Sequence, residues 1–155
     1  MKVIDILRVK GGTLYTVSPD ETLVHAIETM SQFDIGSLVV MEGGTLAGML
    51  TFREVIHTVA QNGGHVRECT VRDVMDADPM ACSPNTELEQ VRPMMLEKHT
   101  RYMPVMDGKM LMGVISFYDV AKAVVDAQNF ENKLLKAYIR DWPKADEDGN
   151  IDTAA

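Results

Sequence analysis

Apolar side chains recur at helical spacing in two separate parts of the chain. One part has Leu23, Ala26, Ile27 and Met30, and the other has Leu88, Val91, Met94 and Met95. Because residues three and four positions apart share one face of an α-helix, this spacing predicts two amphipathic helices. The second is expected at about residues 87–98. It contains Pro93, which has no backbone N–H, so we expect a kink there.

Each of these helices is followed by the pattern of a β-hairpin. Short apolar runs at residues 37–41 and 102–106 end at Glu42-Gly43-Gly44 and Asp107-Gly108-Lys109, which are typical turn sequences. Return strands are predicted at residues 46–50 and 110–115. A second helix is expected to begin near Phe52 and near Phe117, and Gly63-Gly64 to end the first of them. Each half therefore reads β-α-β-β-α, a mixed α/β (α+β) fold.

The two halves are copies of one another, displaced by 65 positions. Ser18-Pro19 returns as Ser83-Pro84, and Leu46-Ala47-Gly48 returns as Leu111-Met112-Gly113. Such a repeat predicts two similar units, at residues 1–64 and 65–125. The helical pattern continues beyond the second unit, so a helical extension is predicted at residues 126–143. Residues 144–155 are acidic and poor in bulky side chains, which predicts a disordered tail.

Composition narrows the range of partners. The 155 residues are 46% hydrophobic and 25% charged, which is typical of a soluble globular protein. The net charge of −8 repels phosphate backbones and anionic lipids, so neither nucleic acid nor a membrane is an expected partner. No export signal or apolar membrane span is evident, and Cys69 and Cys82 form no metal or disulfide motif. We therefore expect a cytoplasmic protein.

The sequence offers little for catalysis. The four histidines are scattered, and the chain contains no metalloprotease, nucleophile-elbow or P-loop motif. The twelve methionines are explained by packing alone, without a metal. We therefore predict a protein that is not an enzyme and that has no metal site or catalytic cofactor.

Four stretches resemble the CBS-domain family, which is named after cystathionine β-synthase. They are residues 3–7 and 71–75 before the two repeats, Arg101-Tyr102-Met103-Pro104-Val105-Met106-Asp107, and Gly113-Val114-Ile115-Ser116-Phe117-Tyr118-Asp119-Val120. The resemblance covers roughly residues 1–125. It implies two repeats packed sheet to sheet with pseudo-twofold symmetry, two clefts for adenosine-containing ligands, and a homodimer. It further implies a stand-alone sensor that regulates a protein partner whose identity the sequence does not give.

The resemblance also assigns roles at the start of the second repeat's last helix. The family's hydroxyl position, here Ser116, contacts a phosphate, and its carboxylate position, here Asp119, accepts hydrogen bonds from ribose hydroxyls. Arg101 and Arg53 are expected to clamp the phosphate between them, with His99 as a weaker candidate. An apolar slot for adenine is predicted at Met80, Ala81, Tyr102, Met103 and Pro104. For Met103, core packing is an equally good interpretation.

A weaker second site is predicted in the first repeat, at Thr51, Glu54, Gly36, Ser37, Leu38 and Thr16. Gly36 stands where the second repeat has Arg101, so this site lacks an arginine to bind the phosphate. Both the Ser-x-x-Asp and the Thr-x-x-Glu patterns are also capping boxes, which satisfy a helix's own N–H groups. Glu54 suits that structural role better than the shorter Asp119.

AMP or NAD is the favoured ligand, while ADP, ATP and S-adenosylmethionine remain open. The alternative is a structural module that binds no nucleotide and docks a partner protein through its C-terminal helix, around Phe130 to Trp142.

Overall fold

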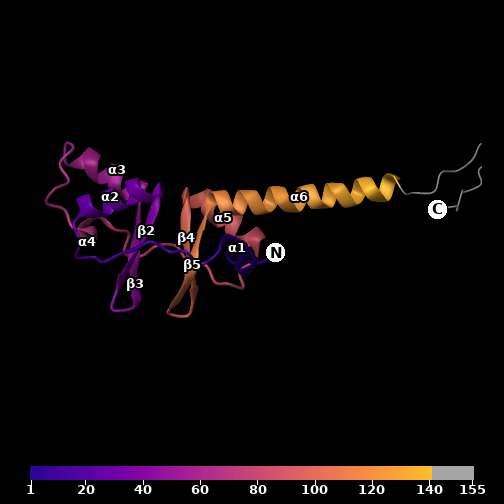
Figure 1. Cartoon of the computed structure of the whole chain (residues 1–155), viewed down its shortest axis with the longest axis horizontal. Coiled ribbons are helices and arrows are strands. Elements are labelled where there is room, and N and C mark those ends of the chain that lie inside the picture. Colours follow the sequence, from indigo (N-terminus) through magenta and orange to yellow (C-terminus); the bar gives the residue numbers. More distant parts are fainter. Residues whose placement is uncertain (141–155) are drawn as a thin grey trace, which may run out of the picture. The chain divides into compact units, whose positions relative to one another are not determined.

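The computed structural model describes residues 1–140 (Figure 1). Trp142 and the tail predicted at residues 144–155 lie outside the described residues. Residues 1–120 form one compact unit, and the remainder of the last helix belongs to a second. In chain order the elements are α1 (Val3–Lys10), β1 (Thr16–Val17), α2 (Leu23–Phe33), β2 (Ser37–Glu42), β3 (Thr45–Thr51), α3 (Phe52–Gln61), α4 (Val71–Val74), α5 (Leu88–Lys98), β4 (Tyr102–Asp107), β5 (Met110–Ser116) and α6 (Phe117–Arg140).

The predicted β-α-β-β-α order is confirmed in the first repeat and, except for a full opening strand, in the second. Strands β2 and β3 form an antiparallel hairpin, as do β4 and β5, and β1 adds a parallel strand beside β2. In the second repeat the opening strand is reduced to a single parallel bridge between Cys82 and Val105. Helix α5 continues through Pro93 to Lys98.

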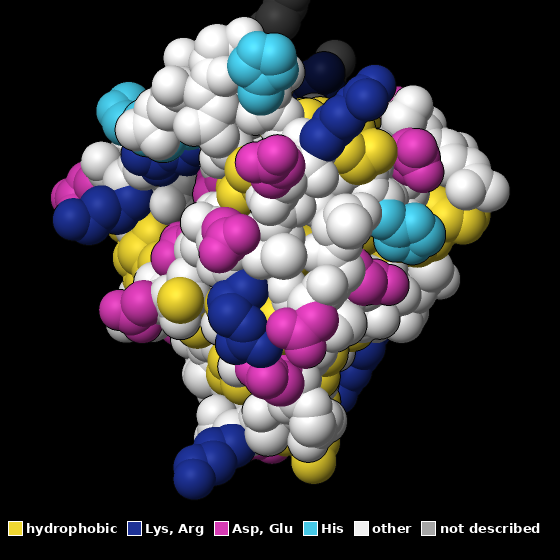
Figure 2. All heavy atoms as spheres, turned by 90° about the vertical axis from the view of Figure 1, so that its left-hand side faces the viewer, with side chains coloured by type: hydrophobic (Ala, Val, Ile, Leu, Met, Phe, Trp, Pro, Cys, Tyr) yellow, Lys and Arg dark blue, Asp and Glu magenta, His cyan; other side chains and the backbone are white. Residues whose placement is uncertain are grey.

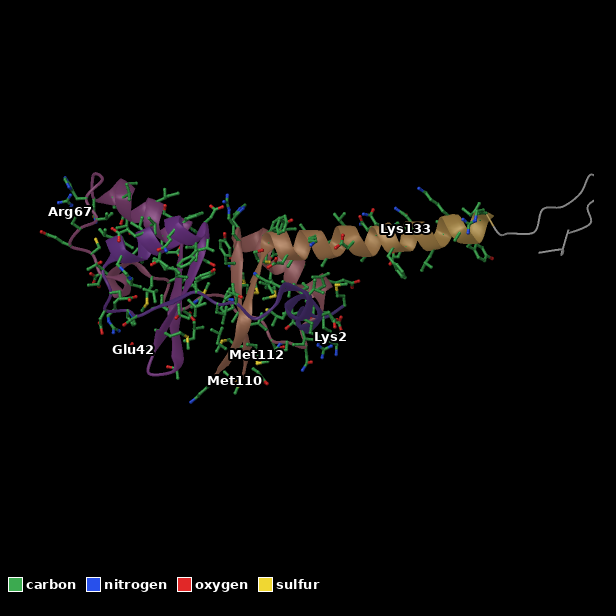
Figure 3. The ribbon with its side chains drawn as sticks, viewed as in Figure 1. Lys2, Glu42, Arg67, Met110, Met112 and Lys133 are labelled. Carbon is green, nitrogen blue, oxygen red and sulfur yellow. The ribbon has the colours of Figure 1, made fainter. Side chains whose placement is uncertain are left out.

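The two hairpins carry the same irregularity at the same place. The register shifts between Val40 and Met41 in the first and between Val105 and Met106 in the second. One extra residue on the return strand, Ala47 or Met112, therefore has no partner opposite it, which is a β-bulge. The turns need glycine because Gly43, Gly44 and Gly108 all have positive φ, a region that other residues rarely adopt. Met110 and Met112 lie toward the turn of the second hairpin (Figure 3).

The sheets of the two repeats pack against each other, as predicted (Figure 1). The contact is built on Val39 and Met49 from the first sheet and Val114 from the second, all of them buried. Successive strand residues point to opposite faces, so Leu38, Val40 and Leu50 face the other way. They form the first repeat's core with the apolar face of α2: Leu23, Ala26 and Met30.

The short helix that precedes each repeat packs on the other repeat. Helix α1 lies against β5, while α4 lies against α2 and α3 (Figure 1). Antiparallel bridges fix both contacts, Lys2 with Glu87 before α5 and Thr22 with Thr70 before α4. Arg72 of α4 adds ion pairs to Glu42 at 2.8 Å and Asp20 at 3.3 Å. This exchange holds the repeats together, and it was not predicted from the sequence.

Candidate functional site

A cleft of about 500 Å³ lies within the compact unit of residues 1–120, with walls from both repeats. The first repeat contributes the start of α3, and the second contributes the end of α5, the start of β4 and the segment before α5. The lining residues that matter chemically are Thr51, Phe52, Arg53 and Glu54 from the first repeat, and Met80, His99, Arg101, Tyr102 and Phe117 from the second.

Thr51 and Glu54 close a capping box at the start of α3. Thr51 donates its backbone N–H to Glu54 Oε1 at 3.2 Å and its hydroxyl to Oε2 at 2.8 Å. Arg53 N–H donates in turn to Thr51 Oγ1 at 3.3 Å. An ionised carboxylate has about four acceptor positions, so Glu54 retains capacity to accept hydrogen bonds from a ligand.

Arg53 and Arg101 reach the same cleft from different repeats. Neither guanidinium has an ion pair with any residue in the described part of the chain. His99, with its imidazole, lines the same cleft. It is the C-cap of α5, with left-handed φ of 51°, and its backbone N–H donates to Leu96 and Met95 carbonyls. Two of the lining residues, Glu54 and Asp76, are acidic.

On one face of the molecule, basic and acidic side chains are mixed. On the face turned to the viewer in Figure 2, Lys and Arg lie among Asp and Glu rather than gathering in a patch. In a chain of net charge −8, Arg53 and Arg101, which have no ion pair in residues 1–140, still give the cleft two cationic groups that can hold an anion.

The remaining walls are apolar and aromatic, with Phe52, Phe117, Tyr102, Met80 and Met49. Tyr102 reaches across to the first repeat, where its hydroxyl lies against Gly36. The two phenylalanines begin α3 and α6, and each is anchored to its own repeat. Phe52 N–H donates to Gly36 O at 3.2 Å and Phe117 N–H to Arg101 O at 2.7 Å. Flat rings and a thioether suit a planar base.

Ser116 and Asp119 are not among the residues that line this cleft. They close a capping box at the start of α6: Ser116 N–H donates to Asp119 Oδ2 at 2.8 Å, and Asp119 N–H donates to Ser116 Oγ at 3.0 Å. Lys10 at the end of α1 also donates to Asp119 Oδ2, at 2.7 Å, and to Val114 O at 3.0 Å. Burial raises the pKa of Asp119, but the hydrogen bonds from Lys10 and Ser116 outweigh it and leave this pKa below its usual value.

The structure groups the predicted site residues differently from the sequence analysis. Arg53, Arg101, Tyr102 and Met80 come together as expected, but around Thr51 and Glu54 instead of Ser116 and Asp119. The reason is the packing of the two sheets, which brings the start of α3 opposite the start of β4. Nucleotide binding at either place stays a prediction.

The other predicted residues lie outside the cleft lining. Met103 and Pro104 are buried in β4, and Leu38 is buried in β2. Gly36 and Ser37 are half-buried where β2 begins, while Thr16 and Ala81 are exposed. Sequence reasoning missed Phe52 and Phe117 as lining residues, although the repeat pairs them at identical positions before two helices.

Residues 1–140 contain neither a cluster of metal-binding side chains nor a helix suited to cross a membrane. The structure places no group of three His, Cys, Asp or Glu side chains where they could share a metal ion. None of the helices in this range combines the length and the apolar character needed to cross a membrane.

Comparison with known proteins points to the CBS-domain family. The model of the CBS domain matches residues 12–61 and 71–126. The CBS domain-containing protein YhcV of Bacillus subtilis is 35% identical over 107 residues, which cover 68% of this chain and 75% of the relative. A crystal structure of a CBS-domain containing protein from Agrobacterium tumefaciens is 31% identical, with a TM-score of 0.75, over 79% of this chain and 98% of that chain. The structure of CBSX2 in complex with AMP shares the fold at 22% identity, with a TM-score of 0.68, over 82% of this chain and 98% of that chain.

Proposed function

Because this chain belongs to the CBS-domain family, as a tandem pair of repeats, we propose that it binds an adenine nucleotide in the cleft between them and acts as a sensor. One observation carries the proposal: Arg53 and Arg101, from different repeats and without ion pairs in residues 1–140, line one cleft that also has aromatic walls. The cleft volume of about 500 Å³ falls within the range of small-ligand sites.

Each part of a nucleotide has a matching group. The phosphate binds between Arg53 and Arg101, since guanidiniums form short, charge-assisted hydrogen bonds to phosphate oxygens. The ribose hydroxyls donate to the free lone pairs of Glu54, the residue that stands at the family's carboxylate position. The base lies among Phe52, Tyr102, Phe117 and Met80. AMP and NAD are the preferred ligands because two guanidiniums suit one or two phosphates, and CBSX2, a protein of the same fold, is known in complex with AMP.

Sensing follows from the location of the cleft. A ligand held by both repeats favours the inter-repeat geometry that brings its two arginines together, so it shifts the population toward that state. We further propose that the chain forms a homodimer, through which a change between repeats reaches a regulated partner. No chemical step is part of this proposal, so the bound nucleotide is recovered unchanged.

Thermal denaturation of the full chain with AMP, ADP, ATP, NAD, S-adenosylmethionine and adenosine tests the proposal. A ligand that binds only the folded state raises the melting temperature further as its concentration rises. We expect such a rise for AMP or NAD, and its loss in Arg101→Gln. Arg101 is exposed and unpaired within residues 1–140, so this change should leave the fold intact. Equal melting temperatures with and without every compound would refute the proposed function.

A second function is favoured by the surface of α6 itself. Phe130, Leu134, Leu135 and Ile139 are each more than half exposed, an unusual density of large apolar side chains for one helix. A module that docks a partner protein through α6 would account for them. Such a module shows no thermal shift with any nucleotide, so the same experiment separates the two functions.

A further inference from the structure

The cleft residues and the residues related to them by the repeat differ in charge. Moving each cleft residue by the repeat displacement of 65 positions gives its counterpart. Arg101 corresponds to Gly36, Arg53 to Tyr118, and His99 to Asp34. All three positions are thus basic in the cleft. None of them is basic in the counterpart set, where Asp34 is acidic.

The carboxylates of the two sets also differ in their charged partners. Asp119 corresponds to Glu54, and both accept a hydrogen bond from the backbone N–H of their own helix cap. Of the two, only Asp119 is also paired with a cation among residues 1–140, because Lys10 reaches it from α1 at 2.7 Å. The side chain of Asp119 is 16% exposed, and that of Lys10 is 37% exposed. Lys10 thereby neutralises the one group in the counterpart set that a ribose would bind.

We infer that the chain binds one phosphate-bearing nucleotide, at Thr51–Glu54 and Arg101, and none at Ser116–Asp119, where Lys10 acts as an internal partner of the carboxylate. This inference rests on the proposed function and specifies which of the two repeat-related sets of residues carries it. The charge differences between the sets, and not the Ser-x-x-Asp or Thr-x-x-Glu pattern, decide where the phosphate goes.

Isothermal titration of the full chain with AMP and with NAD gives the number of sites directly. We expect one site per chain. Glu54→Ala and Asp119→Ala are compared because each removes the carboxylate of a capping box and so lowers helix stability. Asp119→Ala also removes the ion pair with Lys10. Glu54→Ala should weaken binding about tenfold or more, as loss of a hydrogen bond to a charged group does. Asp119→Ala should leave both affinity and stoichiometry unchanged.

A second variant keeps the test valid if either alanine variant unfolds. Arg53→Gln with Arg101→Gln changes only exposed side chains that have no ion pair in residues 1–140, and it should abolish binding. Two sites in the wild type, a full site remaining in this double variant, or weaker binding in Asp119→Ala would each overturn the inference while leaving nucleotide binding intact. Absence of binding in the wild type would instead refute the proposed function, and the inference with it.

Discussion

The hydroxyl of Tyr102 lies so close to Gly36 that a Cβ at residue 36 would overlap it. A Cβ there would also come within 2.8 Å of Tyr102 Cζ and 3.2 Å of Phe52 Cε2. Gly36 has no unusual backbone angle, so it is not the chain conformation that requires glycine but the approach of Tyr102 from the other repeat. Because Tyr102 and Phe52 both line the cleft, residue 36 controls the shape of one of its walls.

Gly36→Ala is therefore expected to displace Tyr102 and to weaken nucleotide binding. Overpacking of this kind costs about 1–3 kcal/mol of stability. Gly12→Ala is the control, since a Cβ at residue 12 meets nothing within 4 Å. Denaturant unfolding and titration with AMP measure the two effects. Combining Gly36→Ala with Tyr102→Phe should recover part of the stability. If Gly36→Ala changes the unfolding free energy and the AMP affinity no more than Gly12→Ala does, the contact between residue 36 and Tyr102 contributes to neither.

The sequence predicts the repeat unit well because its signals are local. Helical spacing at Leu23 to Met30 and the Gly43-Gly44 turn each depend on a few neighbouring residues, and the repeat confirms them a second time. The assembly of the site depends instead on contacts between residues far apart in the chain. That Tyr102 meets Gly36, or that Lys10 meets Asp119, follows from packing the two sheets and exchanging α1 and α4. No local pattern encodes either contact.

Gly48 and Gly113 occupy the same repeat position but should respond differently to alanine. A Cβ at Gly48 would overlap the backbone carbonyl oxygen of Asp76, which is itself bridged to β3 by Met49. A Cβ at Gly113 would come within 2.8 Å of Leu7 Cδ2, the flexible end of a side chain. Backbone cannot move aside as a side-chain tip can.

We expect Gly48→Ala to destabilise the fold by about 3 kcal/mol or more and Gly113→Ala by about 1 kcal/mol, from overpacking with and without room to relax. Urea unfolding followed by circular dichroism measures both. Equal losses of unfolding free energy for the two variants would mean that the contact with the Asp76 backbone is no stiffer than the contact with the Leu7 side chain. The same experiment tests the packing of α4 on the first repeat and of α1 on the second, which depends on these two close contacts.

Asp119 makes the stability of the fold depend on pH. Its pKa is lowered in the folded protein, where Lys10 and Ser116 donate to the ionised carboxylate. The folded state therefore favours the ionised form, and this contribution is complete at neutral pH, above the unfolded pKa. It is lost as the pH falls through the lowered folded value, below about pH 4.

Asp119→Asn removes this contribution, so its loss of unfolding free energy relative to wild type should be largest near pH 7 and shrink below about pH 4. Denaturant titrations at a series of pH values measure it. Asp107→Asn provides the control, because Asp107 is exposed in the hairpin and makes no side-chain hydrogen bond or ion pair in residues 1–140. A loss for Asp119→Asn that stays constant down to about pH 3 would mean that Lys10 does not favour the ionised carboxylate.

The two cleft arginines should distinguish ligands by their phosphate. AMP and adenosine share the base and the sugar, so their difference in affinity measures what Arg53 and Arg101 contribute. Arg53→Gln and Arg101→Gln are each expected to weaken AMP binding about tenfold or more and to leave adenosine binding nearly unchanged. Arg67→Gln serves as the control, since Arg67 is exposed in the turn before α4 and lies outside the cleft lining (Figure 3).

The dependence of affinity on salt concentration is a second, independent way to compare AMP with adenosine. Exposed charges are screened over about 10 Å at 0.1 M salt and about 3 Å at 1 M. AMP affinity should therefore fall as salt rises, while adenosine affinity changes little. The salt dependence should be smaller in Arg101→Gln, because one of the two interacting charges is gone, and unchanged in Arg67→Gln. Titration calorimetry at low and high salt measures the wild type and both variants. If AMP and adenosine bind equally well at low salt, the phosphate does not lie between the arginines, and the base and sugar alone account for binding.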